Sequence, residues 1–482
     1  MNNLPAETDV AVIGSGAAGL AAALTAAEGG ARVIIFEKER SPGGTSNFFE
    51  GTFAVESDMQ RERYITYSRD EAFKNIMEYS HWLANPRLVR AIINESGATI
   101  GWLQQQGVVF ADATINMPDS PRTYHVVKGK GEAVVKALTT RVREKGVDIK
   151  LATPVKRIVK QGENIRGVIA EVDGEDTPFA AKVVVIASGG YLNNKEWIKK
   201  YTGFDLDINL VAIGNVDKMG DGIRMAWESG AEEENISLLE LYRAGPIGPD
   251  FAMGCQLECA VVQPDLWVDP HGERFCDESV AFYDSSVGNA NARFKEGFTY
   301  SIFDDTALSR MIENGITKSV NVNTLPGTKP TDIYREINAA LERGTKELFV
   351  ADSVAGLAEQ MGVSTATLKA TVDEYNSCCE KRHDDLFAKD PKYLHLLTGP
   401  KYYAVKARTV CLGTMGGIKI NEKAEVINKK GAVIPGLYAA GFDAGGMYGD
   451  SYPIKCSSGL ASAFAMNTGR IAGKNALKYI GK

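Results

Sequence analysis

The chain begins with two short, wholly apolar segments on either side of a longer, alanine-rich segment. Residues 10–13 read VAVI and residues 33–36 read VIIF, so both are rich in β-branched side chains. Continuous apolar runs of this length are typical of strands buried on both faces of a parallel sheet. The alanine-rich segment between them favours a helix. We therefore predict a β-α-β unit at the start of the chain.

Later segments alternate between helical and strand patterns. Residues 70–85, 86–107 and 365–382 predict helices. Residues 147–191 contain alternating segments that predict a small antiparallel layer, and they include the fully apolar stretch Val183 to Ala187, which we assign to the first sheet. A long final helix is expected from about Ser458.

The length of the chain and one change of pattern predict more than one domain. With 482 residues the chain is too long for one ordinary core. Residues 238–350 change to mixed short strands and helices, and no proline-rich or serine-rich linker separates them from their neighbours. We therefore predict a doubly wound α/β domain built from residues 1–237 and 351–482, with residues 238–350 as an inserted domain.

Charge and cysteine content exclude several classes of function. The chain has 54 Lys and Arg residues against 61 Asp and Glu residues, a net charge of −7, with no basic run. Nucleic acid and membrane partners are therefore not expected. Without a signal segment or a long apolar stretch, we expect a cytoplasmic protein. The 7 cysteines form no CxxC pair, so no metal, iron–sulfur or haem site is predicted.

A glycine motif follows the first strand. Gly14, Gly16 and Gly19 have GxGxxG spacing. The first glycine permits a tight turn, the second lets a pyrophosphate approach the backbone, and the third lets the helix lie close to the strand. The helix N-terminus then presents N–H groups and a partial positive charge to the phosphates. Glu37 follows roughly twenty residues later, where a carboxylate binds ribose hydroxyls. This unit predicts a site for the ADP part of a dinucleotide.

Motifs along nearly the whole chain resemble one family. In order they are GSGAAGLAAA with Glu37, SPGGTS, VVVIASGGY, GDGIRMAWESGA, GERFCDE, YSIFDD, TMGGIKIN, and IPGLYAAGFDAGG with GRIAG. They resemble the flavoproteins related to fumarate reductase, the succinate dehydrogenase flavoprotein subunit and 3-ketosteroid dehydrogenases. The resemblance implies a doubly wound, Rossmann-like FAD-binding domain with an inserted α+β capping domain. It also implies hydride exchange between flavin N5 and a substrate carbon across the domain cleft.

The resemblance also assigns contacts to FAD. Gly43 and Gly44 would let the backbone approach the flavin chain, and the final helix would direct its N-terminal dipole at the N1/C2=O edge. Family members with covalent flavin have a histidine where this chain has Thr45, so noncovalent FAD is expected. The family's usual glutamate after AAG is Phe442 here, and the adjacent Asp443 is the predicted substitute. The predicted cofactor contacts are Gly14, Gly16, Ala17, Ala18, Gly19, Glu37, Lys38, Gly43, Gly44, Thr45, Ser46, Val155, Ala187, Ser188, Gly189, Asp221, Gly416, Gly441, Asp443, Ser458, Gly459 and Leu460.

Other departures from the family pattern remove the residues that bind a dicarboxylate. Aligning the motifs places Phe282 at the position of the family's proton-donating arginine and Gly413 at that of its substrate histidine. Residues 445–459 contain no arginine, and Lys455 is the only cation among them. One flexible ammonium is a poor substitute for a bidentate guanidinium. Fumarate is therefore not the expected substrate.

Phenols take the place of these charges. Tyr283 follows the RF-containing motif, and Tyr448 and Tyr452 lie in MYGDSYP. Tyr283 and Tyr452 resemble the tyrosines of ketosteroid dehydrogenases that handle the proton and hydrogen-bond the carbonyl, the first with a small offset. A phenol with a pKa of roughly 10 holds its proton at neutral pH until a carbanion forms, and a second phenol can stabilise the enolate. We predict Tyr283, Tyr452 and Tyr448 as catalytic residues, and Tyr124 is a further candidate.

Three hypotheses on function follow. The first is an FAD-dependent oxidoreductase acting on a carbon–carbon double bond conjugated to a carbonyl, in an apolar, steroid-like or aromatic substrate. The second is a reductase of an unsaturated carboxylate, fumarate-like or acrylate-like, in which Lys455 or Arg243 binds one carboxyl group. The third is a flavin-binding electron carrier or redox sensor without turnover. His125 is expected to support the flavin site indirectly, and Glu258 to be a structural carboxylate.

The sequence leaves the electron partner open. It contains a single GxGxxG motif, so a second nucleotide domain for a nicotinamide donor is not evident, and it has no cluster or haem motif. Electrons would then come from a separate protein, a small carrier, NADH directly, or the substrate itself.

Overall fold

A computed structural model describes residues 7–214, 216–252, 254–321 and 324–482. The chain divides into two compact units. Unit 1 comprises the residues up to Gly203 together with Ala212–Glu240 and Leu412–Lys482, and unit 2 comprises Phe204–Val211 and Leu241–Cys411. Three of the described strands, β10 (Val211–Ala212), β12 (Leu239–Ala244) and β16 (Tyr402–Thr414), have residues in both units.

The main sheet of unit 1 has a doubly wound core. Its strand order is β18-β19-β9-β1-β2-β6, and β19, β9, β1, β2 and β6 run parallel. β18 pairs antiparallel with β19, while β7 and β8 extend β9 as the predicted antiparallel layer. The bounds are β1 (Glu7–Ile13), β2 (Val33–Phe36), β6 (Asp148–Lys150), β7 (Val155–Gln161), β8 (Asn164–Val172), β9 (Glu175–Ile186), β18 (Glu425–Ile427) and β19 (Val433–Ala439).

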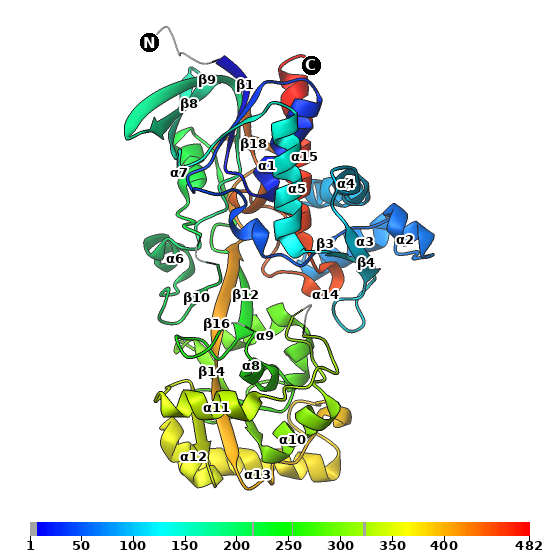
Figure 1. Cartoon of the computed structure of the whole chain (residues 1–482), viewed down its shortest axis with the longest axis vertical. Helices are drawn as coiled ribbons and strands as arrows, with labels where there is room; N and C mark the ends of the chain where they lie inside the picture. Colours follow the sequence, from blue (N-terminus) through cyan, green and yellow to red (C-terminus); the bar gives the residue numbers. More distant parts are fainter. Residues whose placement is uncertain (1–6, 215, 253, 322–323) are drawn as a thin grey trace. The chain divides into compact units, whose positions relative to one another are not determined.

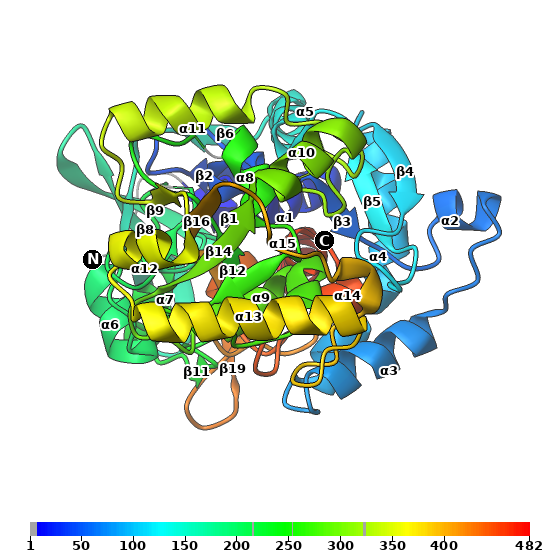
Figure 2. The same ribbon diagram turned by 90° about the horizontal axis from the view of Figure 1, so that it is seen from below.

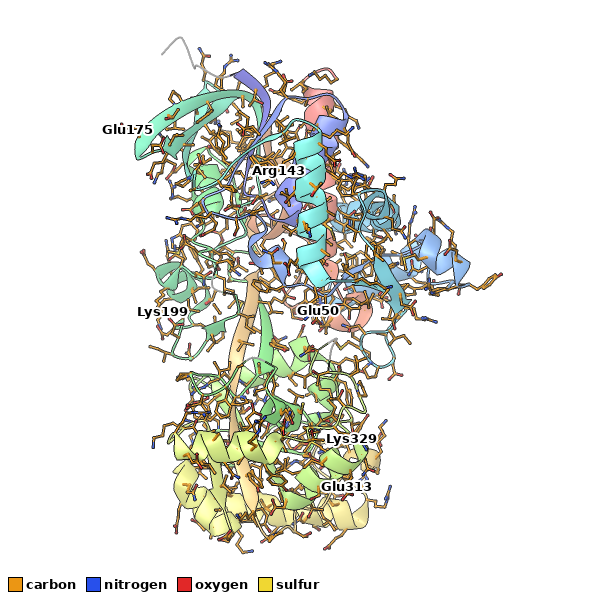
Figure 3. All side chains as sticks on the ribbon, viewed as in Figure 1. Glu50, Arg143, Glu175, Lys199, Glu313 and Lys329 are labelled. Carbon is orange, nitrogen blue, oxygen red and sulfur yellow. The ribbon has the colours of Figure 1, made fainter. Side chains whose placement is uncertain are left out.

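Small residues pack the helices of unit 1 closely together. Figure 1 shows α1 (Ala17–Glu28) running alongside α15 (Leu460–Tyr479) and α5 (Lys130–Glu144). A Cβ on Gly469 would overlap the carbonyl oxygen of Ala18, so the glycine lets α15 approach the alanine-rich helix. The outer face of α5 carries charged side chains such as Arg143, labelled in Figure 3. The other helices are α2 (Asp58–Glu62), α3 (Arg69–Tyr79), α4 (Pro86–Gln105), α6 (Lys195–Thr202), α7 (Asp221–Glu228) and α14 (Ile454–Ser457).

Two small sheets complete unit 1. One has the strand order β3-β5-β4, and the other pairs β11 with β17. The bounds are β3 (Gly51–Phe53), β4 (Phe110–Thr114), β5 (Tyr124–Val127), β11 (Glu233–Glu234) and β17 (Gly417–Ile418).

Unit 2 is built on a sheet whose alternating side chains form two separate cores. Its strand order is β10-β16-β14-β13, and β12 and β15 also pair with β16. On β14, Phe303 faces a core formed with α8, α10 and α11, whereas Ile302 faces a core formed with α12 and α13. Figure 2 shows α11 and α13 on opposite sides of β14. The bounds are β10 (Val211–Ala212), β13 (Leu266–Val268), β14 (Phe298–Asp304), β15 (Leu348–Ala351), α8 (Gln256–Val261), α9 (Asp284–Asn291), α10 (Asp305–Asn314), α11 (Ile333–Glu342), α12 (Val354–Met361) and α13 (Thr365–Lys381).

The second unit extends beyond the boundary predicted at residue 350. It continues to Cys411, so α12 and α13 belong to it rather than to the flavin-binding part. The physical reason is that both helices cover one face of the unit 2 sheet and bury Leu357, Leu368 and Tyr375 there. Over the described residues, no helix combines the length and apolar character that crossing a membrane requires.

Candidate functional site

The predicted cofactor residues gather at the carboxyl ends of the parallel strands of unit 1. The strands end at the same edge of the sheet, because the Ala187 N–H donates to the Ile13 carbonyl (2.8 Å) and the Ala440 N–H donates to the Ile186 carbonyl (2.9 Å). The Gly14 N–H likewise donates to the Phe36 carbonyl (2.8 Å). Ligands of open α/β sheets bind at this edge, where the strand order reverses.

The glycines of the motif occupy places where a side chain would not fit. Gly14 has a φ of +101°, and a Cβ there would overlap the Ala187 carbonyl oxygen. A Cβ on Gly19 would overlap the Gly14 carbonyl oxygen, so the glycine allows α1 to start close to β1. At Gly16 a Cβ would come within 3.3 Å of the Ser46 hydroxyl oxygen, which accepts a hydrogen bond from the Ala17 N–H (2.9 Å). The strand–helix turn therefore lies directly beside the Gly43–Ser46 segment.

Glu37 is held in place by the motif itself. One carboxylate oxygen accepts from the Ser15 N–H (2.9 Å) and the Ser15 hydroxyl (2.6 Å), and the other accepts from the Glu39 N–H (2.9 Å). Because a carboxylate oxygen offers two lone-pair positions, the second oxygen keeps a place for a ribose hydroxyl. Ser15 was not predicted as part of the site, although its position inside the glycine motif is a signal that could have identified it.

Lys38 connects the second strand to the start of α7. Its ammonium pairs with Asp221 (3.1 Å) and Asp217 (3.0 Å). Partial burial lowers the pKa of Lys38, but the charges of Asp221 and Asp217 outweigh it and raise the pKa overall. The Gly222 N–H, also at the start of α7, donates to the Ser188 hydroxyl (3.1 Å). These bonds bring the predicted contacts Lys38, Asp221 and Ser188 to the same edge of the sheet.

Asp443 organises the loop after β9. Its fully buried carboxylate accepts from the Ser188 hydroxyl (3.0 Å) and from the N–H groups of Ser188, Gly189 (3.1 Å) and Gly190 (3.1 Å). Burial raises the pKa of Asp443 despite these hydrogen bonds. The residue predicted to contact the flavin chain thus shapes a second predicted cofactor segment, and the direct contact stays a prediction.

The remaining predicted cofactor residues also lie in unit 1. The Gly441 N–H donates to the Thr468 hydroxyl of α15 (3.0 Å), and Gly459, with a φ of +79°, is the N-cap of α15. Gly416 packs against the backbone of Asn235, where a Cβ would overlap the Asn235 carbonyl oxygen. Thr45 lies in the 3₁₀ helix η1 (Gly44–Asn47). Ala18 lies in the first turn of α1, and Val155 is the first residue of β7. Leu460 is the first residue of α15, and Ser458 precedes that helix by two positions.

Tyr448 and Tyr452 form a buried pair at the start of α15. They are 1% and 3% exposed, and their ring centroids are 5.7 Å apart. The Tyr452 hydroxyl accepts from the Ala461 N–H of the first turn of α15 (3.1 Å). Among the described residues the Tyr448 hydroxyl has no hydrogen-bond partner. Buried polar atoms are nearly always paired in folded proteins, so the contact of this hydroxyl with a substrate stays a prediction.

Both phenols are neutral hydrogen-bond donors at physiological pH. Burial raises the pKa of Tyr448 well above its usual value, and the neighbouring Tyr452 and Glu240 raise it further. Burial likewise raises the pKa of Tyr452, with Glu240 adding to the effect. A neutral phenol that cannot readily lose its proton can stabilise negative charge on a substrate oxygen without becoming an anion itself.

Two buried charged residues of unit 1 were missed by the sequence analysis. Glu240 is 8% exposed, and burial raises its pKa to about 7, with Lys218 acting in the opposite direction. Lys218 is 3% exposed and donates to the Leu412 carbonyl (3.4 Å). The sequence contains one indication that Glu240 is buried, because it stands among the apolar residues of LLELY. Lys218 lies in a loop, and the sequence around it does not indicate burial.

Tyr283 lies in unit 2. It follows the 3₁₀ helix η2 (Glu278–Phe282) and is the N-cap of α9. Its N–H donates to the Val280 carbonyl (2.8 Å), and its side chain is half-buried. The preceding Phe282 packs against Tyr393, with ring centroids 5.2 Å apart. The catalytic role of Tyr283 stays a prediction.

Phe442 and Gly413, which both differ from the family pattern, are in direct contact. A Cβ on Gly413 would lie 2.5 Å from the Phe442 ring. The ring therefore fills the volume in which a side chain at position 413 would stand. An aromatic ring at position 442 thus excludes a histidine at position 413 in this arrangement, so the two sequence changes form one structural change.

Three other residues considered in the sequence have structural roles. His125 donates from Nδ1 to the Thr123 carbonyl (3.0 Å), its Nε2 accepts from the Ser57 hydroxyl (2.8 Å), and burial lowers its pKa to about 4. Arg243 donates to Thr299, Ser301 and Val261 in the core of unit 2 and stacks on Trp267 at 4.0 Å. Glu258 accepts from the Gly254 N–H (2.7 Å). The other candidate, Tyr124, is buried in β5.

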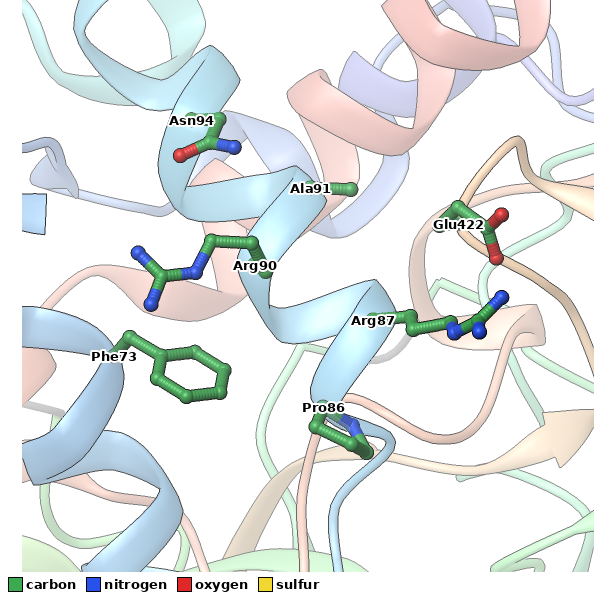
Figure 4. Close-up of a pocket in the computed structure, with 7 residues that line it drawn as sticks. All are labelled: Phe73, Pro86, Arg87, Arg90, Ala91, Asn94 and Glu422. Atoms are coloured by element: carbon green, nitrogen blue, oxygen red, sulfur yellow. The ribbon is translucent and has the colours of Figure 1, made fainter. Parts of the chain in front are cut away.

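A surface pocket lies between α3 and α4, away from the predicted residues. Figure 4 shows the residues that line it, which are Phe73, Pro86, Arg87, Arg90, Ala91, Asn94 and Glu422. The volume of the pocket is about 460 Å³. Arg90 pairs with Asp70 (2.7 Å) and stacks on Phe73 at 4.1 Å. None of the predicted cofactor or catalytic residues lines this pocket, so we do not assign the reaction to it.

Known proteins match nearly the whole length of this chain. The profile of a family described as FAD binding domain matches residues 9–460. The chain belongs to this family of FAD-binding flavoproteins. It is 34% identical over 480 residues to the vinyl phenol reductase of Lactiplantibacillus plantarum, which covers 98% of this chain and 96% of that protein.

Two solved structures have the same fold. The open conformation of a flavocytochrome c3 fumarate reductase matches with a TM-score of 0.74 and 26% identity, over 99% of this chain and 79% of that one. A 3-ketosteroid-Δ4-(5α)-dehydrogenase from Rhodococcus jostii RHA1 matches with a TM-score of 0.77 and 22% identity, over 99% and 98%. The flavoprotein therefore has the predicted α/β fold, uses FAD, and is an oxidoreductase acting on carbon–carbon double bonds.

The geometry of Glu37 predicts the effect of removing its carboxylate. Glu37→Ala should weaken FAD binding by about 10- to 100-fold, because a hydrogen bond to a charged group contributes about 1.5–3 kcal/mol. The measurement is a fluorescence titration of the apoprotein with FAD. Glu39→Ala is the matched control, since Glu39 contributes a backbone N–H to this arrangement. Equal affinities for the two variants would contradict the assignment of Glu37 to the ribose.

Proposed function

We propose that this flavoprotein reduces, or in reverse forms, a carbon–carbon double bond conjugated to a neutral oxygen group in an apolar substrate. The oxygen group is a carbonyl, or a phenol conjugated to the double bond through its ring. One observation carries the proposal. Tyr448 presents a buried hydroxyl without a partner among the described residues, next to a second phenol at the start of α15.

FAD fits the residues at the strand ends and, when bound, supplies or accepts a hydride. The glycines of the motif carry no side chain that would block a pyrophosphate from the backbone. One carboxylate oxygen of Glu37 can accept a further hydrogen bond, from a ribose hydroxyl. The Ala461 N–H in the first turn of α15 donates a hydrogen bond to the Tyr452 hydroxyl, so Tyr452 lies at the N-terminus of this helix. The helix N-terminus that we assign to the flavin therefore lies next to the phenol that we assign to the substrate.

The phenols suit the charge that develops on the substrate. When a hydride adds to the β-carbon of an enone, negative charge moves to the carbonyl oxygen, and a proton must then reach the α-carbon. Tyr448 and Tyr452 would donate hydrogen bonds to that oxygen. A general acid would supply the proton, the role that the sequence analysis predicts for Tyr283. One hydride and one proton together convert C=C to CH–CH.

A vinylphenol can follow the same course. Its hydroxyl is conjugated through the ring to the vinyl group, so protonation of the terminal carbon together with loss of the hydroxyl proton yields a quinone methide, in which the oxygen has become a carbonyl. Hydride addition at the carbon next to the ring then returns the electrons to that oxygen, which takes up a proton again, so the net change is one hydride and one proton. The substrate of the Lactiplantibacillus relative is therefore equivalent to an enone for a site that hydrogen-bonds oxygen.

The charged residues favour a neutral substrate over a dicarboxylate. The Arg243 guanidinium is buried and donates to three partners in the core of unit 2. Lys455 is exposed on α14. Neither provides the buried bidentate clamp that binds a carboxylate well.

Anaerobic stopped-flow absorbance tests the proposal. Photoreduced FAD protein would be mixed with 4-vinylphenol, a 4-en-3-one steroid, fumarate and cinnamate. We expect rapid flavin reoxidation by a neutral substrate and slow reoxidation by both carboxylates. Reoxidation by fumarate or cinnamate alone would overturn the proposal and favour a carboxylate reductase. Failure of every compound to reoxidise the flavin would favour an electron carrier.

A further inference from the structure

We propose that Asn235 is a positioning residue for Tyr448: its side-chain amide anchors the backbone of the tyrosine loop, residues 445–453, and so sets where the phenol meets the substrate. This inference rests on the proposed function, because it takes Tyr448 as a substrate contact. It goes beyond that function by naming a residue that acts on the reaction through Tyr448 rather than through a contact of its own.

The tyrosine loop needs anchors from outside its own sequence. It reads GGMYGDSYP, so three of its nine residues are glycines, whose backbone has many accessible conformations. The Tyr448 ring packs against Tyr452 and Phe464, with ring centroids 5.7 and 5.9 Å away. The Tyr448 hydroxyl, however, has no hydrogen-bond partner among the described residues. The place of this hydroxyl therefore depends on ring packing and on how the loop backbone is held.

Hydrogen bonds hold the loop before, at and after Tyr448. Before it, the Asn85 N–H donates to the Gly446 carbonyl (2.7 Å). After it, the Tyr452 hydroxyl accepts from the first turn of α15. At Tyr448 itself, the Nδ2 of Asn235 donates to the backbone carbonyl (2.9 Å). Asn235 is therefore the side chain that fixes the backbone of the residue whose phenol is assigned to the substrate.

Asn235 is itself held in place by close backbone packing. It directly follows β11, which pairs with β17, and its φ of +51° is a left-handed conformation that asparagine adopts more readily than most residues. A Cβ on Gly416, a predicted cofactor contact, would overlap the Asn235 carbonyl oxygen. A Cβ on Gly445 would lie 2.4 Å from the carbonyl oxygen of Glu234. Asn235 thus connects the segment assigned to the cofactor with the loop that carries Tyr448.

A small displacement of the phenol is enough to slow the reaction. A hydrogen-bond donor stabilises a developing oxyanion only over a short distance, and a misplacement of about 1 Å can cost about 10²-fold in rate. Without the Asn235 amide, the glycine-rich loop would place the Tyr448 hydroxyl correctly for only part of the time. We expect a smaller loss than for removal of the hydroxyl, because the ring contacts and the bond from Asn85 remain.

Single-turnover kinetics of the photoreduced holoenzyme measure this effect. The substrate is 4-vinylphenol or the 4-en-3-one steroid, whichever reoxidises the wild-type flavin faster. Asn235→Gly removes the amide and still accepts a positive φ. We expect it to lower the maximal rate of flavin reoxidation about tenfold, with little change in the half-saturating substrate concentration, because the lost interaction strengthens in the transition state. Asn235→Ala should have the same effect without the added freedom of glycine, and it provides the test if the glycine variant does not fold.

A double-mutant cycle with Tyr448→Phe shows whether Asn235 acts through the phenol. In the Tyr448→Phe background, Asn235→Gly should change the rate by less than about twofold, because no hydroxyl is left to position. Asn475→Ala is the matched control. Its amide is also half-buried in unit 1 and donates to a backbone carbonyl, that of Ile471 (2.9 Å). This control should keep the rate in both backgrounds.

The outcomes separate the inference from the proposed function. An unchanged rate in Asn235→Gly and Asn235→Ala, or an equal loss with and without the Tyr448 hydroxyl, would overturn the inference while the proposed function stands. If Tyr448→Phe alone reacts as fast as the wild-type protein, Tyr448 leaves the proposed site and the inference fails with it. If neither neutral substrate reoxidises the wild-type flavin, the proposed function fails first, and the inference that rests on it fails as well.

Discussion

Tyr448→Phe is expected to lower the turnover of a neutral substrate by about 10²- to 10³-fold, the usual cost of removing one hydrogen-bond donor to a developing oxyanion. The same variant should be as stable as the wild-type protein or slightly more stable. The Tyr448 hydroxyl is buried without a partner among the described residues, so its removal costs no hydrogen bond and relieves a desolvated polar group. Loss of activity without loss of stability would mark the hydroxyl as a functional group.

The measurement combines steady-state turnover with thermal unfolding of the FAD-bound protein. Tyr438→Phe is the matched control, since its buried hydroxyl donates to the Asn475 carbonyl (3.2 Å). That variant should lose a little stability and keep its turnover. Tyr452→Phe should lose both, because its hydroxyl accepts from the Ala461 N–H. Unchanged turnover in Tyr448→Phe would remove Tyr448 from the proposed site.

The elements around the cofactor site follow from local patterns in the sequence. The apolar runs at residues 10–13 and 33–36 lie in β1 and β2, the run from Val183 ends β9, and the glycine motif lies between β1 and α1. Strand periodicity, turn glycines and helix composition are properties of short segments. Because these strands pair in parallel, their carboxyl ends lie at the same edge of the sheet, and no other sequence feature is needed to predict this.

Local patterns predict less well where distant segments decide the structure. The helix predicted over residues 70–85 ends at Tyr79, and the backbone at His81 and Trp82 has positive φ angles. Ser80 packs against the backbone at Gly449, in the loop that carries Tyr448, so a segment far along the chain fixes this turn. Helical periodicity alone contains no information on that contact.

The charged residues of the site show the same limit. Glu240 and Lys218 are 22 positions apart and belong to no shared motif, and their burial is a property of the folded chain. Asp443 was predicted as a cofactor contact because it adjoins Phe442. Asp443 follows β19, and it reaches the loop after β9 because β19 pairs with β9 in the sheet. This pairing cannot be read from either segment alone.

Asp443→Ala is expected to abolish FAD retention and to destabilise the protein by more than about 3 kcal/mol, because three N–H groups and one hydroxyl, all buried or partly buried, lose their acceptor together. Asp443→Asn should be nearly as damaging. An amide has one acceptor oxygen, and its NH₂ group would face N–H donors of the loop. A residue that only touched the flavin chain would tolerate this change much better.

The comparison of Asn and Ala at this position therefore separates two roles for one carboxylate. Thermal unfolding followed by both protein and flavin fluorescence reports stability and FAD release in one experiment. Asp176→Asn, on the exposed part of β9, is the matched control and should behave like the wild-type protein. If Asp443→Asn kept its unfolding temperature and only released FAD more easily, Asp443 would be a direct cofactor contact. A joint loss of stability and FAD would mean that it positions the Ser188–Gly190 loop and, through that loop, the cofactor.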